Sequence, residues 1–323
     1  MEFTNHYVAE NDLLTFINQH YEINGEKIRL YRTSQGRVFF IQCPSGRKVF
    51  KLYMSTWTEG AIQTTRVISY LEDCGYPVVQ IIPTMSSELY ITIDRPERGC
   101  IGVLFEYASG ISINLWENWG QYDKPMRINP LIKQFSQQVA VMHRLMDNYK
   151  DSLIRRGKQQ YFDDMIYFMR RDSYDETKIR DFEEYGNELW RMMERCTAGF
   201  CHGDMHDGNT KYRGKQFTFM DFDRASLSYP VIDLSWLANG TNFIVFDERM
   251  IEVSRRLFDE VYAGYSMERT LTDNDISAVF HFIAVEHLDA NDMIIKNYGI
   301  NKEFMDGQHD WLMRWREVCN KLS

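Results

Sequence analysis

A short polar segment constrains this chain more than any other part of its sequence. Residues 200–209 read Phe-Cys-His-Gly-Asp-Met-His-Asp-Gly-Asn, so Asp204 precedes Asn209 by five positions. Twelve residues beyond Asn209, Asp221 directly follows the apolar run Phe217–Met220. An apolar run with a turn signal before it predicts a β-hairpin. The sequence therefore predicts a polar loop, a hairpin, and a carboxylate at the end of the second strand.

This layout is that of a kinase catalytic loop, H-x-D-x-x-x-x-N, followed after a hairpin by D-F-x. Asp204 is the candidate general base, which would orient an acceptor hydroxyl and take its proton. Asn209 and Asp221 offer an amide oxygen and a carboxylate, the oxygen ligands that suit Mg²⁺. His202 is expected to brace the loop by hydrogen bonding.

The segment His202-Gly203-Asp204 with a later Asp-Phe-Asp resembles the aminoglycoside phosphotransferase and choline kinase superfamily, whereas protein kinases usually carry His-Arg-Asp. The run from Tyr229 to Leu234 fits the same resemblance, which implies a structural role for Asp233. The resemblance further implies an α+β, two-lobed protein-kinase-like fold. Its small antiparallel β-rich N-lobe is expected at residues 1–107, and its larger, mainly helical C-lobe at residues 108–323.

Two other interpretations of the polar segment stay open. Gly-Asp-x-His also occurs in metallophosphoesterases, so His202, Asp204 and His206 could be ligands of a zinc or dinuclear site. The remaining histidines form no second cluster of the kind such a site needs. A purely structural turn would require five spaced positions to match by accident.

Composition excludes some classes of protein. The net charge of −9 argues against a nucleic-acid partner, because binding to the phosphate backbone depends on Lys and Arg. Residues 108–323 hold 27 basic and 34 acidic residues; this excess of acid fits a cationic acceptor, with a solvated acidic surface as the alternative. The sequence has no apolar run long enough to span a membrane and no secretory signal, so we expect a cytoplasmic protein. The six cysteines include no Cys-x-x-Cys pair and are expected to be reduced.

The first hundred residues read as a helix over residues 10–21, with Asn11 as its expected cap, followed by strands that include one at residues 78–83. A loop before the second strand contains Ser34, Gln35 and Gly36, which by analogy with kinases would cover the ATP phosphates. An ordinary hairpin turn is the alternative. Lys51 lies inside the third expected strand, an apolar strand over residues 48–53, where the resemblance implies that it binds the α- and β-phosphates. A solvent-facing lysine on an edge strand is the alternative for Lys51.

One expected partner of Lys51 is missing. Kinases usually pair the strand lysine with a glutamate on the next helix, expected here over residues 59–73. The corresponding positions are Thr64 and Thr65, and Glu59 lies a turn or more too early. Either Glu59 has taken over the pairing or other groups hold Lys51.

The last strand of the expected sheet runs into a connector that resembles the kinase hinge. The resemblance implies that the backbone of Glu106, Tyr107 and Ala108 binds adenine. Gly110 is expected to free the backbone between the lobes.

The chain beyond the hinge is expected to be helical throughout, and its last three helices are expected over residues 250–265, 273–289 and 302–320. His143 is interpreted as a core histidine with its hydrogen bonds satisfied. Aromatic and acidic side chains that could bind an ammonium group are spread over the later helices: Trp236, Tyr262, Tyr265, Phe282, Glu286 and Asp289.

Together these features predict an ATP- and Mg²⁺-dependent phosphotransferase that acts on a hydroxyl of a small molecule, such as an aminoglycoside or an amino alcohol. The missing helix glutamate keeps two alternatives open, a nucleotide-binding pseudokinase and a protein Ser/Thr kinase with a regulatory role.

Overall fold

The computed structural model describes residues 10–33, 36–93, 99–117, 124 and 126–321, and the chain divides into two compact units. The first unit comprises Met1–Ser112 and Gly208–Arg224, and the second comprises Ile113–Asp207 and Ala225–Ser323. The chain thus returns to the first unit for the hairpin that follows the polar loop. The lobe boundary expected between residues 107 and 108 remains a prediction.

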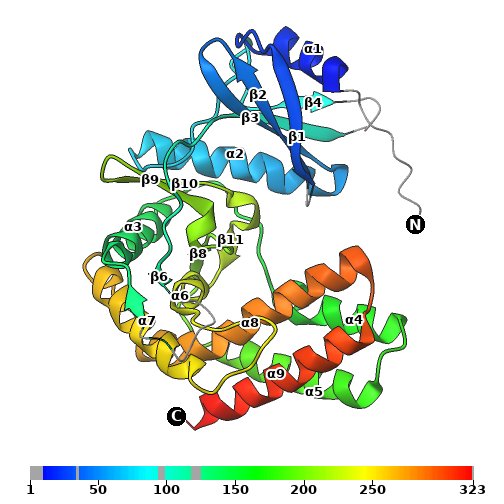
Figure 1. Cartoon of the computed structure of the whole chain (residues 1–323), viewed down its shortest axis with the longest axis vertical. Helices are drawn as coiled ribbons and strands as arrows, with labels where there is room; N and C mark the ends of the chain where they lie inside the picture. The colour runs from blue at the N-terminus through cyan, green and yellow to red at the C-terminus, as the bar shows by residue number, and fades with distance from the viewer. Residues whose placement is uncertain (1–9, 34–35, 94–98, 118–123, 125, 322–323) are drawn as a thin grey trace. The chain divides into compact units, whose positions relative to one another are not determined.

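The first unit is built on a five-stranded antiparallel sheet in the order β1-β2-β3-β5-β4 (Figure 1). Its strands are β1 (Lys27–Thr33), β2 (Gly36–Cys43), β3 (Gly46–Tyr53), β4 (Ile91–Ile93) and β5 (Cys100–Glu106). Its helices are α1 (Glu10–His20), the short η1 (Ser55–Trp57) and α2 (Thr58–Asp73). Hairpin strands β9 (Thr210–Arg213) and β10 (Gln216–Phe219) and the short helix η4 (Phe222–Arg224) also belong to it.

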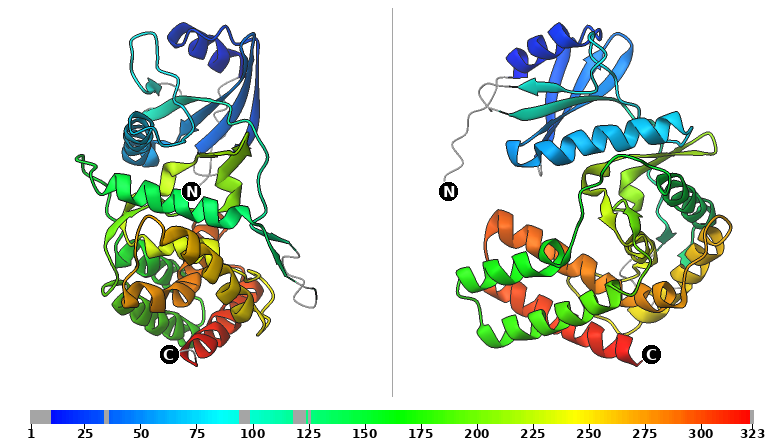
Figure 2. Two further views of the ribbon diagram at one scale, coloured as in Figure 1. Left: turned by 90° about the vertical axis from the view of Figure 1, so that its left-hand side faces the viewer. Right: turned by 180° about the vertical axis from the view of Figure 1, so that it is seen from behind.

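Strand β3 separates two environments because successive side chains point to opposite faces of a sheet. Phe50 and Leu52 are buried in the cluster that packs β1–β5 against Leu13, Leu14 and Ile17 of α1. Lys51 and Tyr53 therefore lie on the opposite face of the strand. Figure 2 shows α2 running beside the sheet.

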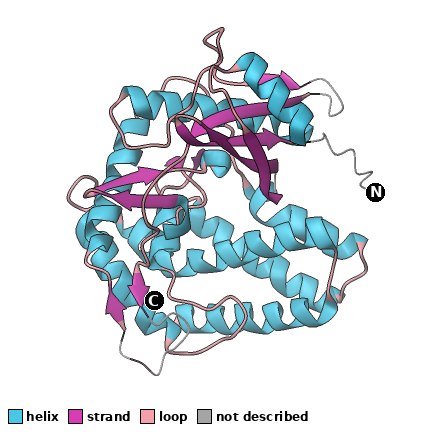
Figure 3. Cartoon of the chain, turned by 45° about the horizontal axis from the view of Figure 1, so that its top comes forward, coloured by secondary structure: helices cyan, strands magenta, loops and turns pink. Residues whose placement is uncertain are grey.

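The second unit is mainly helical (Figure 3). Its helices are α3 (Leu131–Met146), η2 (Gln159–Asp163), α4 (Asp164–Arg171), α5 (Glu176–Met193), α6 (Val231–Ala238), α7 (Met250–Tyr265), α8 (Asp273–Tyr298) and α9 (Lys302–Asn320). A large apolar cluster that includes Phe182, Phe282 and Trp315 forms its core. The short helix η3 (Asp207–Asn209) lies where the chain passes from this unit into the first.

Several details correct the sequence analysis, although the predicted α+β class is confirmed. The C-terminal part is not helical throughout, because β6 (Trp116–Glu117) pairs with β7 (Arg127–Ile128), and β8 (Gly199–Cys201) pairs with β11 (Ser226–Ser228). Residues 78–83, expected as a strand, form only isolated bridges, to Phe219 and to Phe105. This segment divides its hydrogen bonds between β10 and β5, so neither ladder continues along it.

Two helix boundaries were also wrong. Asn11 does not cap α1, because the helix already includes Glu10, whose carboxylate accepts a hydrogen bond from the backbone of Leu30. Helix α8 continues past Asp289 to Tyr298 and ends at Gly299, which has a φ of 76°. Beyond Asp289 the helix accommodates buried polar side chains because they have partners, as in the ion pair between Asp292 and Lys296. None of the described helices is long and apolar enough to cross a membrane.

Candidate active site

The loop that carries Asp204 is held by one buried carboxylate in the second unit. Asp233, in the first turn of α6, is fully buried and accepts hydrogen bonds from the backbone N–H groups of His202 at 2.7 Å and Gly203 at 2.8 Å. Nε2 of His143 donates to the same carboxylate at 2.9 Å, and Nδ1 contacts the Tyr265 hydroxyl at 2.9 Å. His143 is therefore a buried histidine with both ring nitrogens engaged, as predicted.

The charge on Asp233 is stabilised by this arrangement. Burial opposes ionisation, but the hydrogen bond and charge of His143, together with the backbone donor of His202, outweigh it and lower the pKa of Asp233. A buried carboxylate whose lowered pKa favours its charged form thus fixes the backbone just before Asp204. Gly203 adopts a φ of 77°, which residues other than glycine rarely accept.

Asp204 itself remains partly accessible. Its side chain is 27% exposed, and Oδ2 lies 3.7 Å from Nε2 of His206. The ring of His206 lies 5.9 Å from that of Trp236. The ring of His206 therefore lies beside the carboxylate of Asp204 in the loop.

The two candidate metal ligands lie at the open end of the β9–β10 hairpin in the first unit. Thr210 pairs with Phe219, and the backbone N–H of Met220 donates to the carbonyl of Asn209 at 3.0 Å. This register brings Asn209 next to the residues that precede and include Asp221. Asp221 has a φ of 64°, an uncommon conformation for a residue other than glycine that often marks a functional position.

Lys51 is held by both aspartates of the Asp-Phe-Asp segment. Its Nζ donates to Oδ1 of Asp221 at 2.7 Å and to Oδ2 of Asp223. Tyr53, two residues along β3, donates its hydroxyl to Oδ1 of Asp223 at 2.9 Å. Burial opposes the charge on Lys51, but the two carboxylates outweigh it and raise the pKa of the ammonium group. Lys51 therefore carries its charge in a buried position and is not a solvent-facing lysine.

The helix position that usually supplies a glutamate has another role here. Thr64 is buried on α2, and its hydroxyl donates to the carbonyl of Phe222 at 3.2 Å. Thr65 is also buried and donates to the carbonyl of Ile62 in its own helix. Glu59 is exposed in the first turn of α2. Of the two possibilities left by the sequence, the structure supports the one in which other groups hold Lys51.

Sequence reasoning missed two residues of this cluster. Arg32, on β1, donates to Oδ2 of Asp221 at 2.9 Å and forms a second ion pair with that carboxylate. Nothing in the sequence indicated that Arg32 would face Asp221. Tyr53 could have been found from the alternation of β3, because it shares a face with Lys51.

The structure describes only part of the predicted phosphate-covering loop. Ser34 and Gln35 fall outside the described residues. Gly36 begins β2, and a Cβ added there would lie 2.5 Å from the carbonyl oxygen of Leu52. This close approach of β2 to β3 explains the glycine, whereas its predicted role at the phosphates stays a prediction.

The predicted hinge residues follow β5. The carboxylate of Glu106 accepts from Nζ of Lys48 at 2.6 and 2.8 Å, so its side chain is occupied in the sheet. Tyr107 is exposed and Ala108 is half-buried. Gly110 has a φ of 137°, and a Cβ there would lie 2.7 Å from the carbonyl oxygen of Tyr212 on β9. Gly110 thus allows close contact with the hairpin. Adenine binding by Glu106, Tyr107 and Ala108 stays a prediction.

The aromatic candidates for acceptor binding divide into core and partly buried residues. Phe282 and Tyr265 are fully buried in the second unit, whereas Trp236 and Tyr262 are half-buried.

The two acidic candidates are already engaged. Glu286 accepts from the hydroxyl of Ser235 at 2.9 Å and from the amide of Asn239 at 2.8 Å. Asp289 forms an ion pair with Arg156 at 2.7 Å. These carboxylates therefore do not support a cationic acceptor.

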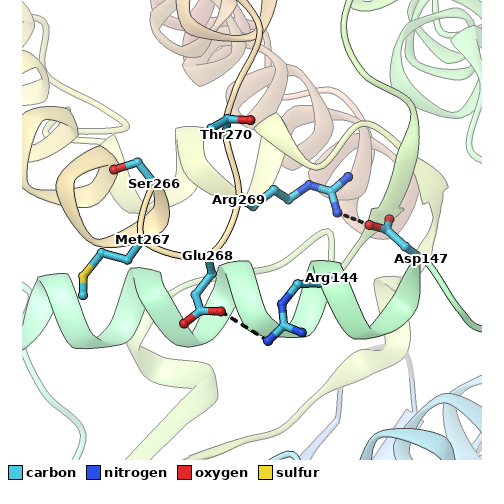
Figure 4. A pocket seen from close by; sticks show the side chains of 7 residues that line it. All are labelled: Arg144, Asp147, Ser266, Met267, Glu268, Arg269 and Thr270. Atoms are coloured by element: carbon cyan, nitrogen blue, oxygen red, sulfur yellow. Dashed lines mark hydrogen bonds and ion pairs between the residues drawn. The ribbon is translucent and has the colours of Figure 1, made fainter.

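A pocket of about 530 Å³ opens elsewhere in the second unit (Figure 4). Its lining residues come from the end of α3 and the segment after α7, and none of them is a predicted site residue. Arg269 pairs with Asp147 at 2.5 Å, and Arg144 pairs with Glu268 at 3.2 Å. Both arginines are therefore already neutralised, so this pocket gives no support for a nucleotide or phosphate site.

Comparison with known proteins assigns the chain. A model of the phosphotransferase enzyme family matches residues 32–267, which include Lys51, Asp204 and Asp221. The chain belongs to the phosphotransferase enzyme family. An uncharacterised protein of Deinococcus radiodurans is 31% identical over 298 residues, which cover 87% of this chain and 80% of that protein. The predicted class of enzyme, a phosphotransferase, is confirmed.

Solved structures of similar fold confirm the predicted kinase-like architecture. An amicoumacin kinase in complex with AMP-PNP, Ca²⁺ and Ami has a TM-score of 0.74 at 18% identity, covering 98% of this chain and 94% of that chain. A microcompartment-associated aminopropanol kinase has a TM-score of 0.70 at 14% identity, covering 95% and 94%. A spectinomycin phosphotransferase in complex with ADP and spectinomycin has a TM-score of 0.63 at 13% identity, covering 97% and 98%.

Proposed function

We propose that this phosphotransferase transfers the γ-phosphoryl group of ATP to a hydroxyl group of a small molecule, with Mg²⁺ bound by Asn209 and Asp221. The observation that carries the proposal is the cluster in the first unit, where a buried lysine faces the aspartate that follows the hairpin. A cation and a metal-binding carboxylate are the two groups that triphosphate binding requires.

The residues present fit Mg²⁺. Asn209 and Asp221 supply oxygen donors, and the hairpin register places them close together. Two protein ligands suffice for a cation that keeps several waters and also binds substrate phosphates. Among the described residues, no group of three or more His, Cys, Asp or Glu side chains is arranged to hold a metal ion, so the geometry gives no support to a zinc or dinuclear hydrolase site. When bound, Mg²⁺ would neutralise charge on the phosphates.

The chain's own residues then have distinct tasks. Lys51 binds oxygens of the α- and β-phosphates through its charged ammonium group. Asp204 accepts a hydrogen bond from the acceptor hydroxyl and takes its proton as the acceptor oxygen bonds to the γ-phosphorus and ADP leaves. Asp233 keeps the backbone before Asp204 in one conformation, so the base needs little reorganisation.

Support for a small-molecule acceptor comes from the family assignment and from the related folds, which include phosphotransferases named for amicoumacin, spectinomycin and aminopropanol. The pseudokinase alternative was based on the missing glutamate partner of Lys51 on α2. Asp221 and Asp223 pair with Lys51 instead, so the missing glutamate no longer supports that alternative.

The first experiment is thermal stability with and without ATP and Mg²⁺, repeated across aminoglycosides, amino alcohols and sugars. We expect ATP with Mg²⁺ to raise the Tm and Asp221→Ala to reduce that rise. A further rise with one compound would nominate the acceptor, and ADP release with that compound would establish turnover. Absence of any nucleotide-dependent rise would overturn the proposal.

A further inference from the structure

We infer that Asp223, supported by Tyr53, is the residue that positions Lys51 for the nucleotide, in place of a glutamate on α2. This inference rests on the proposed function, because it concerns the same phosphate-binding lysine. It assigns a role to the second aspartate of the Asp-Phe-Asp segment, which could otherwise be a second metal ligand.

Burial and hydrogen bonding separate these two roles. The side chain of Asp223 is 5% exposed, whereas that of Asp221 is 19% exposed. Each oxygen of Asp223 has a protein donor, Lys51 on Oδ2 and Tyr53 on Oδ1. A carboxylate with both oxygens engaged by buried protein donors suits a fixed anchor better than a metal ligand, which must offer an oxygen to the ion.

Local structure fixes the anchor in place. Asp223 lies in η4, and the carbonyl of its neighbour Phe222 accepts the hydroxyl of Thr64 on α2. Phe222 is fully buried. Strand β3 delivers both Lys51 and Tyr53 to the same face, so one carboxylate can accept from both. Helix α2 therefore contacts η4 through Thr64 and supplies no carboxylate of its own to Lys51.

The arrangement also divides labour between the two aspartates. Asp221, which Lys51 and Arg32 both contact, is the more exposed and is the proposed metal ligand. Asp223 can keep Lys51 in position when Asp221 exchanges its contact with Lys51 for one with the metal. A kinase-type lysine needs such a partner that stays in place.

The test compares Asp223→Asn and Tyr53→Phe with wild type, and uses Glu59→Gln as the matched control because Glu59 is an exposed carboxylate in the first turn of α2. We expect Asp223→Asn to weaken the metal-free binding of ADP and to raise the KM for ATP. The expected change is about 10²-fold, the size of effect that a misplaced binding group produces. Tyr53→Phe should act in the same direction with a smaller effect, and Glu59→Gln should change neither quantity.

Rescue distinguishes positioning from a merely structural role. Adding Thr64→Glu to Asp223→Asn should restore part of the ADP affinity, because it returns a carboxylate to α2 next to η4. If this double variant does not fold, judged by its thermal transition, metal-free ADP binding to Asp223→Asn and Tyr53→Phe still decides the question.

Two results would overturn the inference. One is unchanged metal-free ADP binding in both single variants. The other is an Asp223→Asn enzyme that regains wild-type kcat and KM for ATP at high Mg²⁺, which would identify a metal ligand. Failure of the proposed function would look different, because wild type would then bind no nucleotide.

Discussion

Asp233 and Asp223 are both buried carboxylates near the predicted chemistry, yet they are stabilised in different ways. Asp233, in the second unit, accepts from two backbone N–H groups and from His143. Asp223, in the first unit, accepts from a lysine ammonium group and a tyrosine hydroxyl. Backbone donors cannot leave a carboxylate without moving the loop, whereas a lysine side chain can bind a ligand as well. The comparison suggests that Asp233 serves stability and that Asp223 serves substrate binding.

The largest expected effect belongs to neither of these residues but to the base that Asp233 supports. Asp204→Asn should lower kcat by about 10²–10⁴-fold, because the amide cannot take the proton of the acceptor hydroxyl. Its Tm and its affinity for ATP should stay at wild-type values, since the Asp233 hydrogen bonds are untouched. Steady-state kinetics with the nominated acceptor and nucleotide binding measure these quantities. An Asp204→Asn enzyme with wild-type kcat would contradict the assignment of the base.

A stability comparison tests the distinction between the two carboxylates directly. In Asp233→Asn, the amide NH₂ must face one of the two backbone donors that now bind carboxylate oxygens. Leaving one buried donor without an acceptor should cost about 1–3 kcal/mol in the free energy of unfolding. Asp223→Asn should cost less, because Lys51 keeps its contact with Asp221. Denaturant unfolding of both variants measures the difference, and equal losses would remove the distinction.

The sequence predicted more of the polar loop than of its surroundings. The loop motif and the hairpin were legible because they depend on short-range spacing, as were α7 and α9, whose observed ends match the expected ones. The partners of Lys51 were not legible, because Asp221 and Asp223 lie about 170 positions away in sequence. Only the folded first unit shows that a carboxylate from η4 replaces one from α2.

The limits of local pattern are clearest at α8. The helix was expected to end at Asp289 but continues to Tyr298, and two polar residues of this extension are buried with specific partners. Asn291 donates to the side chain of Gln308, and Asp292 pairs with Lys296. Such pairings depend on which helices pack together, which periodicity does not specify.

The pH dependence of stability gives a finer test of Asp233. Its folded pKa lies below the ordinary value of 3.8, so its contribution to stability is fully present above 3.8 and is lost as the pH falls through the folded pKa. The stability difference between wild type and Asp233→Asn should therefore be constant from about pH 5 to about pH 7 and should shrink in more acidic solution. Unfolding measured from neutral to acidic pH checks the prediction. A stability difference between the two proteins that grows as the pH falls would contradict it.

The smallest expected effect concerns Glu286, a third buried carboxylate. Its pKa is raised, whereas that of Asp233 is lowered, so its stability contribution depends on pH in the opposite direction. Burial raises its pKa well above 4.5, although Asn239 and Ser235 donate to it, and the nearby charges of Asp204 and Asp233 act in the same direction as burial. A raised folded pKa in an acid means that stability falls as the pH rises from 4.5 towards the folded pKa. Glu286→Gln removes this titration, so its stability relative to wild type should increase with pH over that interval. If the stabilities of the two proteins instead changed with pH in the same way, Glu286 would be ionised as readily in the folded state as in the unfolded chain. In that event the donors on α6 and beyond it, rather than burial, would control the charge of this carboxylate.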